Sequence, residues 1–131
     1  MKVIVKGIMC EEDALLSIKS GADSIWISNS CNFKSKSASS TINVLPSIAK
    51  AVKSVYPNVS ILMDSGIRRG TDVMKCLAYG ADGVFINRPI AWGLTYNGEE
   101  GVGELLCMLN EEVRLAMALT HCFKIKDITQ E

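Results

Sequence analysis

A ten-residue pattern occurs twice in this sequence, and the repeat restricts the fold more than any other feature. Residues 20–29 read SGADSIWISN, and residues 79–88 read YGADGVFINR. In each copy a glycine precedes a short loop, as is typical after a helix end. A run of apolar residues follows, as is typical of a strand that is buried on both faces. The repeat therefore predicts parallel strands covered by helices, which is an α/β fold.

The rest of the chain alternates in the same way. We expect strands at residues 3–5, 24–28, 59–63 and 83–86. We expect helices at residues 11–20 and 41–55, a helix capped by Thr71 that ends at Gly80, a short segment opened by Pro89, and a helix at 99–119. Four βα units of this kind are half of a TIM (β/α)8 barrel, which typically needs about 250 residues. A half-barrel leaves both outer strands unpaired, so we expect altered ends or association with another half.

Composition narrows the class of protein. The chain has 131 residues, of which 48% are hydrophobic, and its 14 basic and 14 acidic residues give a formal net charge of zero. We expect one domain over 1–131 with a polar tail at 120–131, and neither a nucleic acid nor a membrane as partner. Five cysteines without CxxC spacing predict reduced thiols in an intracellular protein. No cluster of residues with metal-ligand spacing is apparent in the sequence, so we expect no metal.

A glycine-rich segment with two arginines follows the third expected strand. Residues 64–72 read DSGIRRGTD. Gly66 and Gly70 allow the backbone to turn and to approach a ligand closely, and the next helix offers N–H groups and a positive dipole end at its N-terminus. Arg68 and Arg69 carry donors that suit a phosphate. The segment therefore predicts a phosphate-binding loop.

A second loop of this type, residues 85–89 with the sequence FINRP, follows the next strand. In a barrel the ligand lies at the carboxyl ends of the strands, which is where both loops fall. The alternative is that Arg68 and Arg88 are ordinary surface charges.

These motifs identify a resemblance. Residues 68–72, 80–86 and 88–89 read RRGTD, GADGVFI and RP, and the chain resembles from Val5 onward the C-terminal half of the FMN-dependent 2-hydroxy-acid oxidases. The resemblance implies the last four βα units of a TIM barrel, FMN as cofactor and a small 2-hydroxy acid as substrate. It also implies peroxisomal location by analogy, although the chain carries no terminal targeting tripeptide, so that a cytoplasmic location stays open.

The resemblance assigns roles to particular residues. The lysine at the position of Lys6 lies near the flavin pyrimidine, and the residue at the position of Ser28 also contacts the flavin. The ribityl chain and the phosphate are held by residues that match Asp64, Ser65, Gly66, Ile67, Arg68, Asn87 and Arg88. Ser65 and Asn87 stand where the family usually has glycine. Serine adds little bulk there, and asparagine tolerates unusual backbone angles.

Two departures affect the chemistry more strongly. Ser30 stands at the position of the family's histidine base, and Phe33 at that of the arginine that binds the substrate carboxylate. A serine hydroxyl cannot replace imidazole without an added base. His121 is the only histidine, and we expect it at the end of the last helix. We therefore expect a catalytically impaired or truncated oxidase.

The alternatives are a non-catalytic FMN- or phosphate-binding half-barrel, which associates with itself or with a complete relative, and a phosphate-binding barrel fragment without flavin. The first alternative differs from an oxidase only in turnover, because the anion loops are the same in both. The second alternative lacks the flavin itself, so binding of FMN discriminates it from the others.

Overall fold

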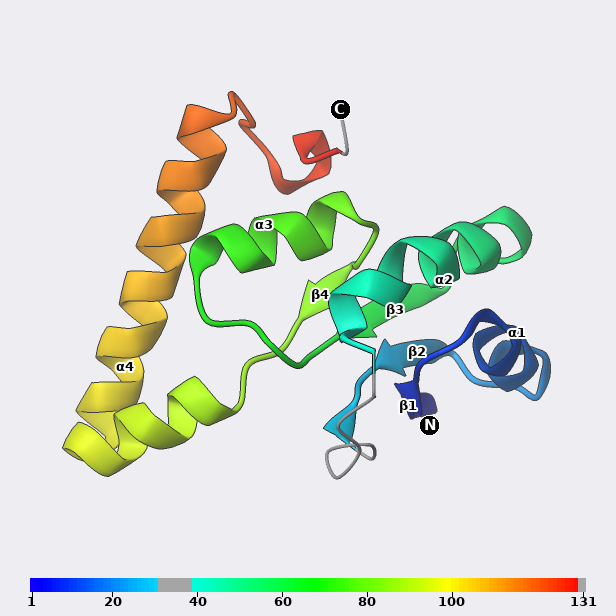
Figure 1. The fold of residues 1–131 in the computed structure, drawn as a ribbon, viewed down its shortest axis with the longest axis horizontal. Coiled ribbons are helices and arrows are strands. Elements are labelled where there is room, and N and C mark those ends of the chain that lie inside the picture. The colour runs from blue at the N-terminus through cyan, green and yellow to red at the C-terminus, as the bar shows by residue number, and fades with distance from the viewer. Residues whose placement is uncertain (31–38, 130–131) are drawn as a thin grey trace.

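The computed structural model describes residues 1–30 and 39–129, and its elements alternate as the sequence predicts (Figure 1). Along the chain they are β1 (Ile4–Ile8), α1 (Glu11–Lys19), β2 (Ser24–Ile27), α2 (Thr41–Val55), β3 (Ser60–Met63), α3 (Gly70–Ala78), β4 (Gly83–Val84), α4 (Arg88–Leu119) and the short 3-10 helix η2 (Ile125–Asp127). The strands form one parallel sheet in the order β1-β2-β3-β4. The predicted parallel sheet is therefore confirmed.

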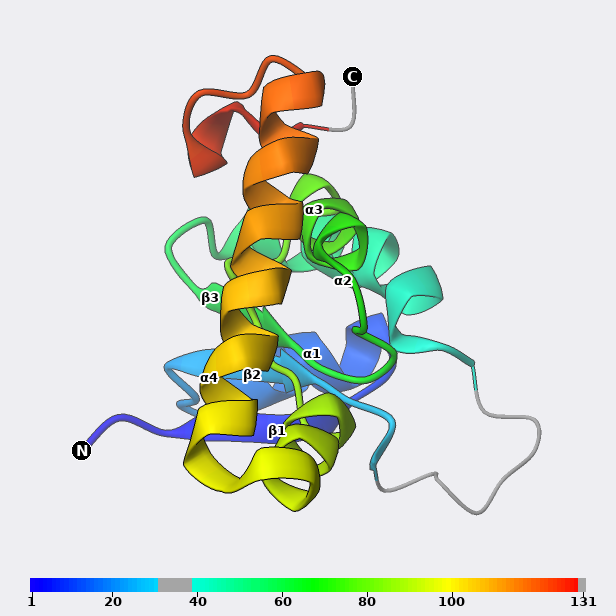
Figure 2. The same ribbon diagram turned by 90° about the vertical axis from the view of Figure 1, so that its left-hand side faces the viewer.

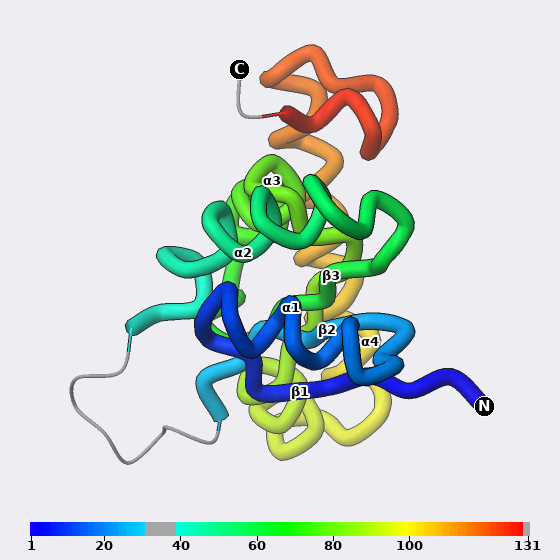
Figure 3. The backbone as a smooth tube through the Cα atoms, turned by 90° about the vertical axis from the view of Figure 1, so that its right-hand side faces the viewer, coloured from blue at the N-terminus to red at the C-terminus, as the bar shows by residue number. Residues whose placement is uncertain are grey.

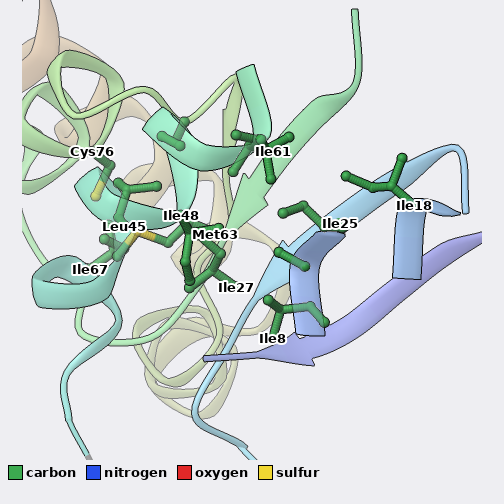
Figure 4. Close-up of a cluster of buried hydrophobic side chains, with 14 residues drawn as sticks. Ile8, Ile18, Ile25, Ile27, Leu45, Ile48, Ile61, Met63, Ile67 and Cys76 are labelled. Atoms are coloured by element: carbon green, nitrogen blue, oxygen red, sulfur yellow. The ribbon is translucent and has the colours of Figure 1, made fainter. Parts of the chain in front are cut away.

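The hydrophobic core lies between this sheet and the helices (Figure 4). In β2, Ile25 and Ile27 are fully buried, because alternate side chains of a strand point to the same face. Trp26, between them, stacks on Phe85, which directly follows β4, with ring centroids 4.1 Å apart. Trp26 is thus a packing residue. Burial raises the pKa of the Cys76 thiol in this core to about 11, which keeps the thiol protonated.

The N-terminus of α3 differs from the prediction. The helix begins at Gly70, with Arg69 at the N-cap position, so the prediction that Thr71 caps it is wrong. The carboxylate of Asp72 accepts the backbone N–H groups of Arg68 and Arg69, each at 3.1 Å. The backbone N–H of Gly70 donates to Glu112 Oε2 at 2.6 Å. Two carboxylates, one of them from α4, therefore cap this helix.

The last helix is bent: the short segment that Pro89 opens is helical, and it joins the predicted helix at 99–119 across a kink. The backbone of Asn97 and Gly98 is non-helical inside α4, so the chain turns there and residues 99–119 pack across α3 (Figure 2). The two arms of α4 meet at glycines: a Cβ on Gly101 would overlap with the carbonyl oxygen of Gly93. Glycine is therefore required for this close approach.

The end of the described chain folds back after α4. The helix ends at Leu119, and His121 follows with a φ of 57°, so this histidine lies just beyond the helix end, as expected. Ile128 is buried, and the tube in Figure 3 shows the segment near α3. Within the described ranges, no helix combines the length and the apolar character that a membrane span requires.

Candidate functional site

A cavity of about 200 Å³ lies at the carboxyl ends of the strands, and it brings together most of the residues that the sequence singled out. The predicted site residues that line this site cavity are Lys6, Ser30, Asp64, Ser65, Gly66, Ile67, Arg68, Asn87 and Arg88. Ser28 is not among the lining residues, but its hydroxyl accepts a hydrogen bond from Lys6. Phe33 lies outside the described residues. Pockets for complete drug-sized ligands measure about 300–1,000 Å³, so the site cavity has the size of part of such a ligand.

Lys6 is the centre of the polar network on one wall of the site cavity. Its Nζ lies 2.8 Å from Asp64 Oδ2 and donates to Ser28 Oγ at 2.8 Å and to Ser30 Oγ at 3.2 Å. An ammonium group has three donors, so these three acceptors fix its position. The register of β1 shifts beside Lys6, at Gly7, whose φ is 102°. A bulge of this kind turns a neighbouring side chain toward a new direction.

The charge state of Asp64 follows from the same contacts. Burial raises the pKa of this carboxyl, but hydrogen bonds from Lys6, Ser28 and Ser65 and the charge of Lys6 lower it more strongly. The net result is a pKa below the ordinary value of 3.8. Asp64 is therefore a carboxylate at neutral pH, and the network holds Lys6 by charge as well as by hydrogen bonds.

The loop after β3 turns through the left-handed region at two successive residues. Ser65 has a φ of 76° and Gly66 a φ of 84°. Glycine adopts such angles freely, but for serine they are strained. Bulk is therefore not what separates Ser65 from the glycine of the resembling family; the backbone angle is. Asn87, by contrast, has a negative φ of −129°, so no left-handed angle is required at this position.

The two arginines of this loop have different surroundings. Arg68 lines the site cavity, and its guanidinium carbon lies 5.4 Å from the ring centroid of Trp92. A cation over a tryptophan face is attracted by the ring quadrupole, so Trp92 orients Arg68. Arg69 is exposed, lies at the N-cap of α3 and does not line the cavity. The glycine-rich motif alone suits both arginines to a phosphate, whereas the resemblance names Arg68 only; in the structure Arg68 lines the cavity and Arg69 does not.

The helix end that faces the site cavity is not the one expected from the sequence. The prediction of available N–H groups at the start of α3 is wrong for Arg68, Arg69 and Gly70, because Asp72 and Glu112 accept those three N–H groups. The N-terminus of α4, which begins at Arg88, adjoins the cavity instead. Its dipole favours an anion there.

The loop after β3 is anchored by one residue that the sequence predicted as part of the site and by one that it did not. Ile67 lines the cavity but is only 5% exposed, and its side chain packs in the core beside Leu45 and Cys76 (Figure 4). Thr41, at the start of α2, donates from its hydroxyl to the carbonyl oxygens of Asp64 and Ser65. Sequence reasoning missed Thr41 and the contact of Trp92, because neither pattern nor spacing indicates a contact across the fold. Residues 1–30 and 39–129 contain no group of three or more His, Cys, Asp or Glu side chains that could hold a metal ion.

Known proteins resemble this chain over its whole length. A 2-hydroxyacid oxidase of Dictyostelium discoideum is 49% identical over 128 residues, which are 98% of this chain and 32% of that protein. The human 2-hydroxyacid oxidase 1 is 44% identical, with 98% of this chain and 34% of that protein covered. A peroxisomal (S)-2-hydroxyacid oxidase of Arabidopsis thaliana is 42% identical, with 99% and 35% covered. The chain thus spans about a third of the length of the curated relatives that it matches.

Solved structures agree with this result. A lactate oxidase of Pediococcus acidilactici superposes with a TM-score of 0.93 at 40% identity, covering 100% of this chain and 36% of that one. A mandelate oxidase variant determined with an FMN adduct superposes with a TM-score of 0.89 at 39% identity, covering 96% and 39%. These likenesses confirm the predicted partial barrel.

The family described as FMN-dependent dehydrogenase matches residues 1–131. The resemblance drawn from the RRGTD, GADGVFI and RP motifs is confirmed, and so is FMN as the cofactor by which the family is described. Taken with the sheet, the two loops and the solved relatives, the match establishes that this chain belongs to the FMN-dependent dehydrogenase family.

Proposed function

We propose that this chain binds FMN through its ribityl-phosphate part in the site cavity, and that it does not by itself oxidise 2-hydroxy acids at the rate of its relatives. One observation carries the binding half of the proposal: Lys6, Arg68 and Arg88 line a single cavity at the strand ends. Cations from three separate elements converge there beside a left-handed turn and a helix N-terminus. This donor set fits a phosphate with an attached polyol.

Each element of the cavity has a distinct task in this proposal. Arg68, oriented by Trp92, binds the phosphate, together with Arg88 and the first turn of α4. The turn at Ser65 and Gly66 lets the backbone approach the polyol. Lys6 presents its positive charge to the flavin end of the cavity while Asp64 and Ser28 hold it in place. When bound, FMN would supply a two-electron acceptor.

The catalytic half of the proposal rests on two residue types: a serine at position 30, where the family has a histidine base, and a phenylalanine at position 33, where it has an arginine. The Ser30 hydroxyl is 3.0 Å from Ser28 Oγ and 3.2 Å from Lys6 Nζ, and neither neighbour is the general base that imidazole would be. Loss of a positioned base costs about 10²–10⁴ in rate. Loss of a charged hydrogen bond to a substrate carboxylate, as Phe33 implies, costs about 1.5–3 kcal/mol.

The binding half is tested with a matched pair of arginine variants. FMN is titrated into the wild-type chain, Arg68→Ala and Arg69→Ala, and quenching of flavin fluorescence gives each Kd. We expect Arg68→Ala to weaken binding by about 1.5–3 kcal/mol, because it removes a charge-assisted bond to the phosphate. Arg69→Ala should change it by less than about 0.5 kcal/mol. Equal losses in both variants would mean that the cavity is not the phosphate site.

The catalytic half is tested on the FMN-loaded chain. Anaerobic mixing with glycolate or lactate should leave the absorbance of oxidised flavin unchanged, since the chain has no imidazole at position 30. Peroxide should not accumulate in air. Bleaching of the flavin band within the time in which a full-length relative turns over would contradict this half while leaving the binding half standing.

The open sheet edges support an additional part of the proposal, the runner-up reading of the sequence. In the described residues β1 pairs only with β2, and β4 pairs only with β3. We include in the proposal that these edges associate with a second copy or with a longer relative. A monomer by light scattering at high concentration would contradict association. An intracellular location, peroxisomal by analogy with the plant relative, completes the proposal.

A further inference from the structure

Thr41 makes hydrogen bonds that its position in the sequence does not explain. It is the first residue of α2 and follows the N-cap residue Ser40. Here Oγ1 is directed across to the loop after β3, and it donates to the carbonyl oxygens of Asp64 at 2.9 Å and of Ser65 at 3.2 Å. Thr41 is 1% exposed, so water does not compete for these bonds.

The two acceptors flank the strained part of the loop. The φ of Ser65 is 76°, and the left-handed conformation costs an L-residue about 1–2 kcal/mol. A single hydroxyl hydrogen shared between adjacent carbonyl groups holds both peptide planes of this turn at once. A buried carbonyl group without a hydrogen-bond donor is unfavourable. If Ser65 relaxed to an ordinary angle, the two carbonyl groups would lose the Thr41 hydroxyl as their donor, so the bond opposes this relaxation.

The same segment is fixed at its two ends by other bonds. The N–H of Asp64 donates to the carbonyl oxygen of Ile27 at 3.1 Å, and the N–H of Arg68 donates to Asp72 Oδ2 at 3.1 Å. Lys6 holds the side chain of Asp64. Between these anchors, and within residues 1–30 and 39–129, the side chain from outside the loop that hydrogen-bonds the backbone of residues 64–65 is that of Thr41.

We infer that Thr41 is a positioning residue for the anion-binding loop: its hydroxyl keeps Ser65 in the left-handed conformation that places Gly66 and Arg68 at the site cavity. The inference rests on the proposed function, since the ligand that the loop receives is the ribityl-phosphate of FMN. Thr41 does not line the cavity, so it acts through the loop and not by touching the ligand.

The test uses Thr41→Val, which removes the hydroxyl at nearly constant shape, and Thr41→Ser, which keeps it. FMN binding should weaken about fivefold in Thr41→Val, the change expected for one lost hydrogen bond, and should be retained within about twofold in Thr41→Ser. The same pair is then measured on Ser65→Gly and on Ser65→Ala. Thr41→Val should cost about fivefold on Ser65→Ala, which keeps the strain, and less than about twofold on Ser65→Gly, which removes it.

A measurement without FMN separates this inference from the proposed function. Hydrogen exchange of the Asp64 and Arg68 amides, followed by NMR in the ligand-free protein, should be about fivefold faster in Thr41→Val and unchanged in Thr41→Ser. If the wild-type chain binds no FMN but the exchange changes as stated, the proposed function fails and the Thr41 contact stands. Unchanged exchange in Thr41→Val would overturn the positioning role. If the wild-type chain binds FMN, an FMN affinity of Thr41→Val equal to that of the wild type would also overturn it.

Discussion

Lys6 Nζ lies 2.8 Å from Asp64 Oδ2, and this ion pair joins the end of β1 to the end of β3 across the intervening β2. The hydroxyl of Ser28, which follows β2, accepts a bond from the same Nζ. Three neighbouring strands are thus connected at their carboxyl ends by one ammonium group. The network fixes Lys6 at the wall of the site cavity.

The stability of the chain should depend on pH through this ion pair. The pKa of Asp64 is lowered in the folded state, so its contribution is present above the ordinary value of 3.8 and is lost as pH falls through the lower folded value. Lys6→Met should cost about 1 kcal/mol at pH 7, since the pair is partly exposed. Urea unfolding at pH 7 and pH 3 should show the cost of Lys6→Met decreasing toward the acid side.

The control for this prediction is Lys50→Met, which removes the same charge from an exposed position on α2. Its effect should be below about 0.5 kcal/mol at both pH values. A cost of Lys6→Met that stays constant, or grows, as the pH falls would contradict the assigned ion pair.

The capping of α3 by Glu112 gives a second prediction. Glu112→Ala removes the carboxylate that accepts the Gly70 N–H at 2.6 Å, and we expect a loss of about 1–2 kcal/mol in the free energy of unfolding. The neighbouring Glu111→Ala removes only a surface pair with Arg114 and should cost about 0.5 kcal/mol or less. Urea unfolding of both variants measures the difference; similar losses would disprove the capping role.

The contact between α3 and α4 gives a third prediction, which compares alanine substitutions at two glycines. A Cβ on Gly70 would overlap with the backbone of Val113 and Glu112, so Gly70→Ala should destabilise the chain by about 1–3 kcal/mol. Gly103, in the same helix as those neighbours, has nothing within 4 Å of an added Cβ, and Gly103→Ala should stabilise by about 0.5–1 kcal/mol. Thermal unfolding should therefore shift in opposite directions; a Gly70→Ala as stable as wild type would rule out the close approach.

Much of the fold was accessible from the sequence because its signals are local. The helix at 41–55 was predicted with the bounds that α2 has, since its apolar stripe is continuous. The sequence separates the short segment opened by Pro89 from the helix at 99–119, and non-helical backbone at Asn97 and Gly98 lies between these two parts of α4. The convergence of Arg68 and Arg88 was predictable because the carboxyl ends of parallel strands meet at one edge, whereas Lys6 was assigned through the resemblance.

Several of the differences from the prediction concern contacts between distant parts of the chain. The start of α3 was misplaced because its cap comes partly from Glu112, on a different helix. The motif alone suits both Arg68 and Arg69 to a phosphate, and the contact of Arg68 with Trp92 has no signal in the sequence. The hydroxyl of Thr41 gave no indication that it would be directed to the loop after β3. Such contacts depend on how elements pack, which periodicity does not encode.

The central claim is that the site cavity holds the phosphate of FMN, and a comparison of FMN with riboflavin tests it most directly. Riboflavin has the same ring and polyol but no phosphate, so both are titrated into the wild-type chain under one buffer, by flavin fluorescence. The cations at the strand ends predict that FMN binds at least about tenfold more tightly, from about 1.5 kcal/mol or more of charge-assisted bonding. Equal affinities for the two flavins, or binding of neither, would contradict the claim.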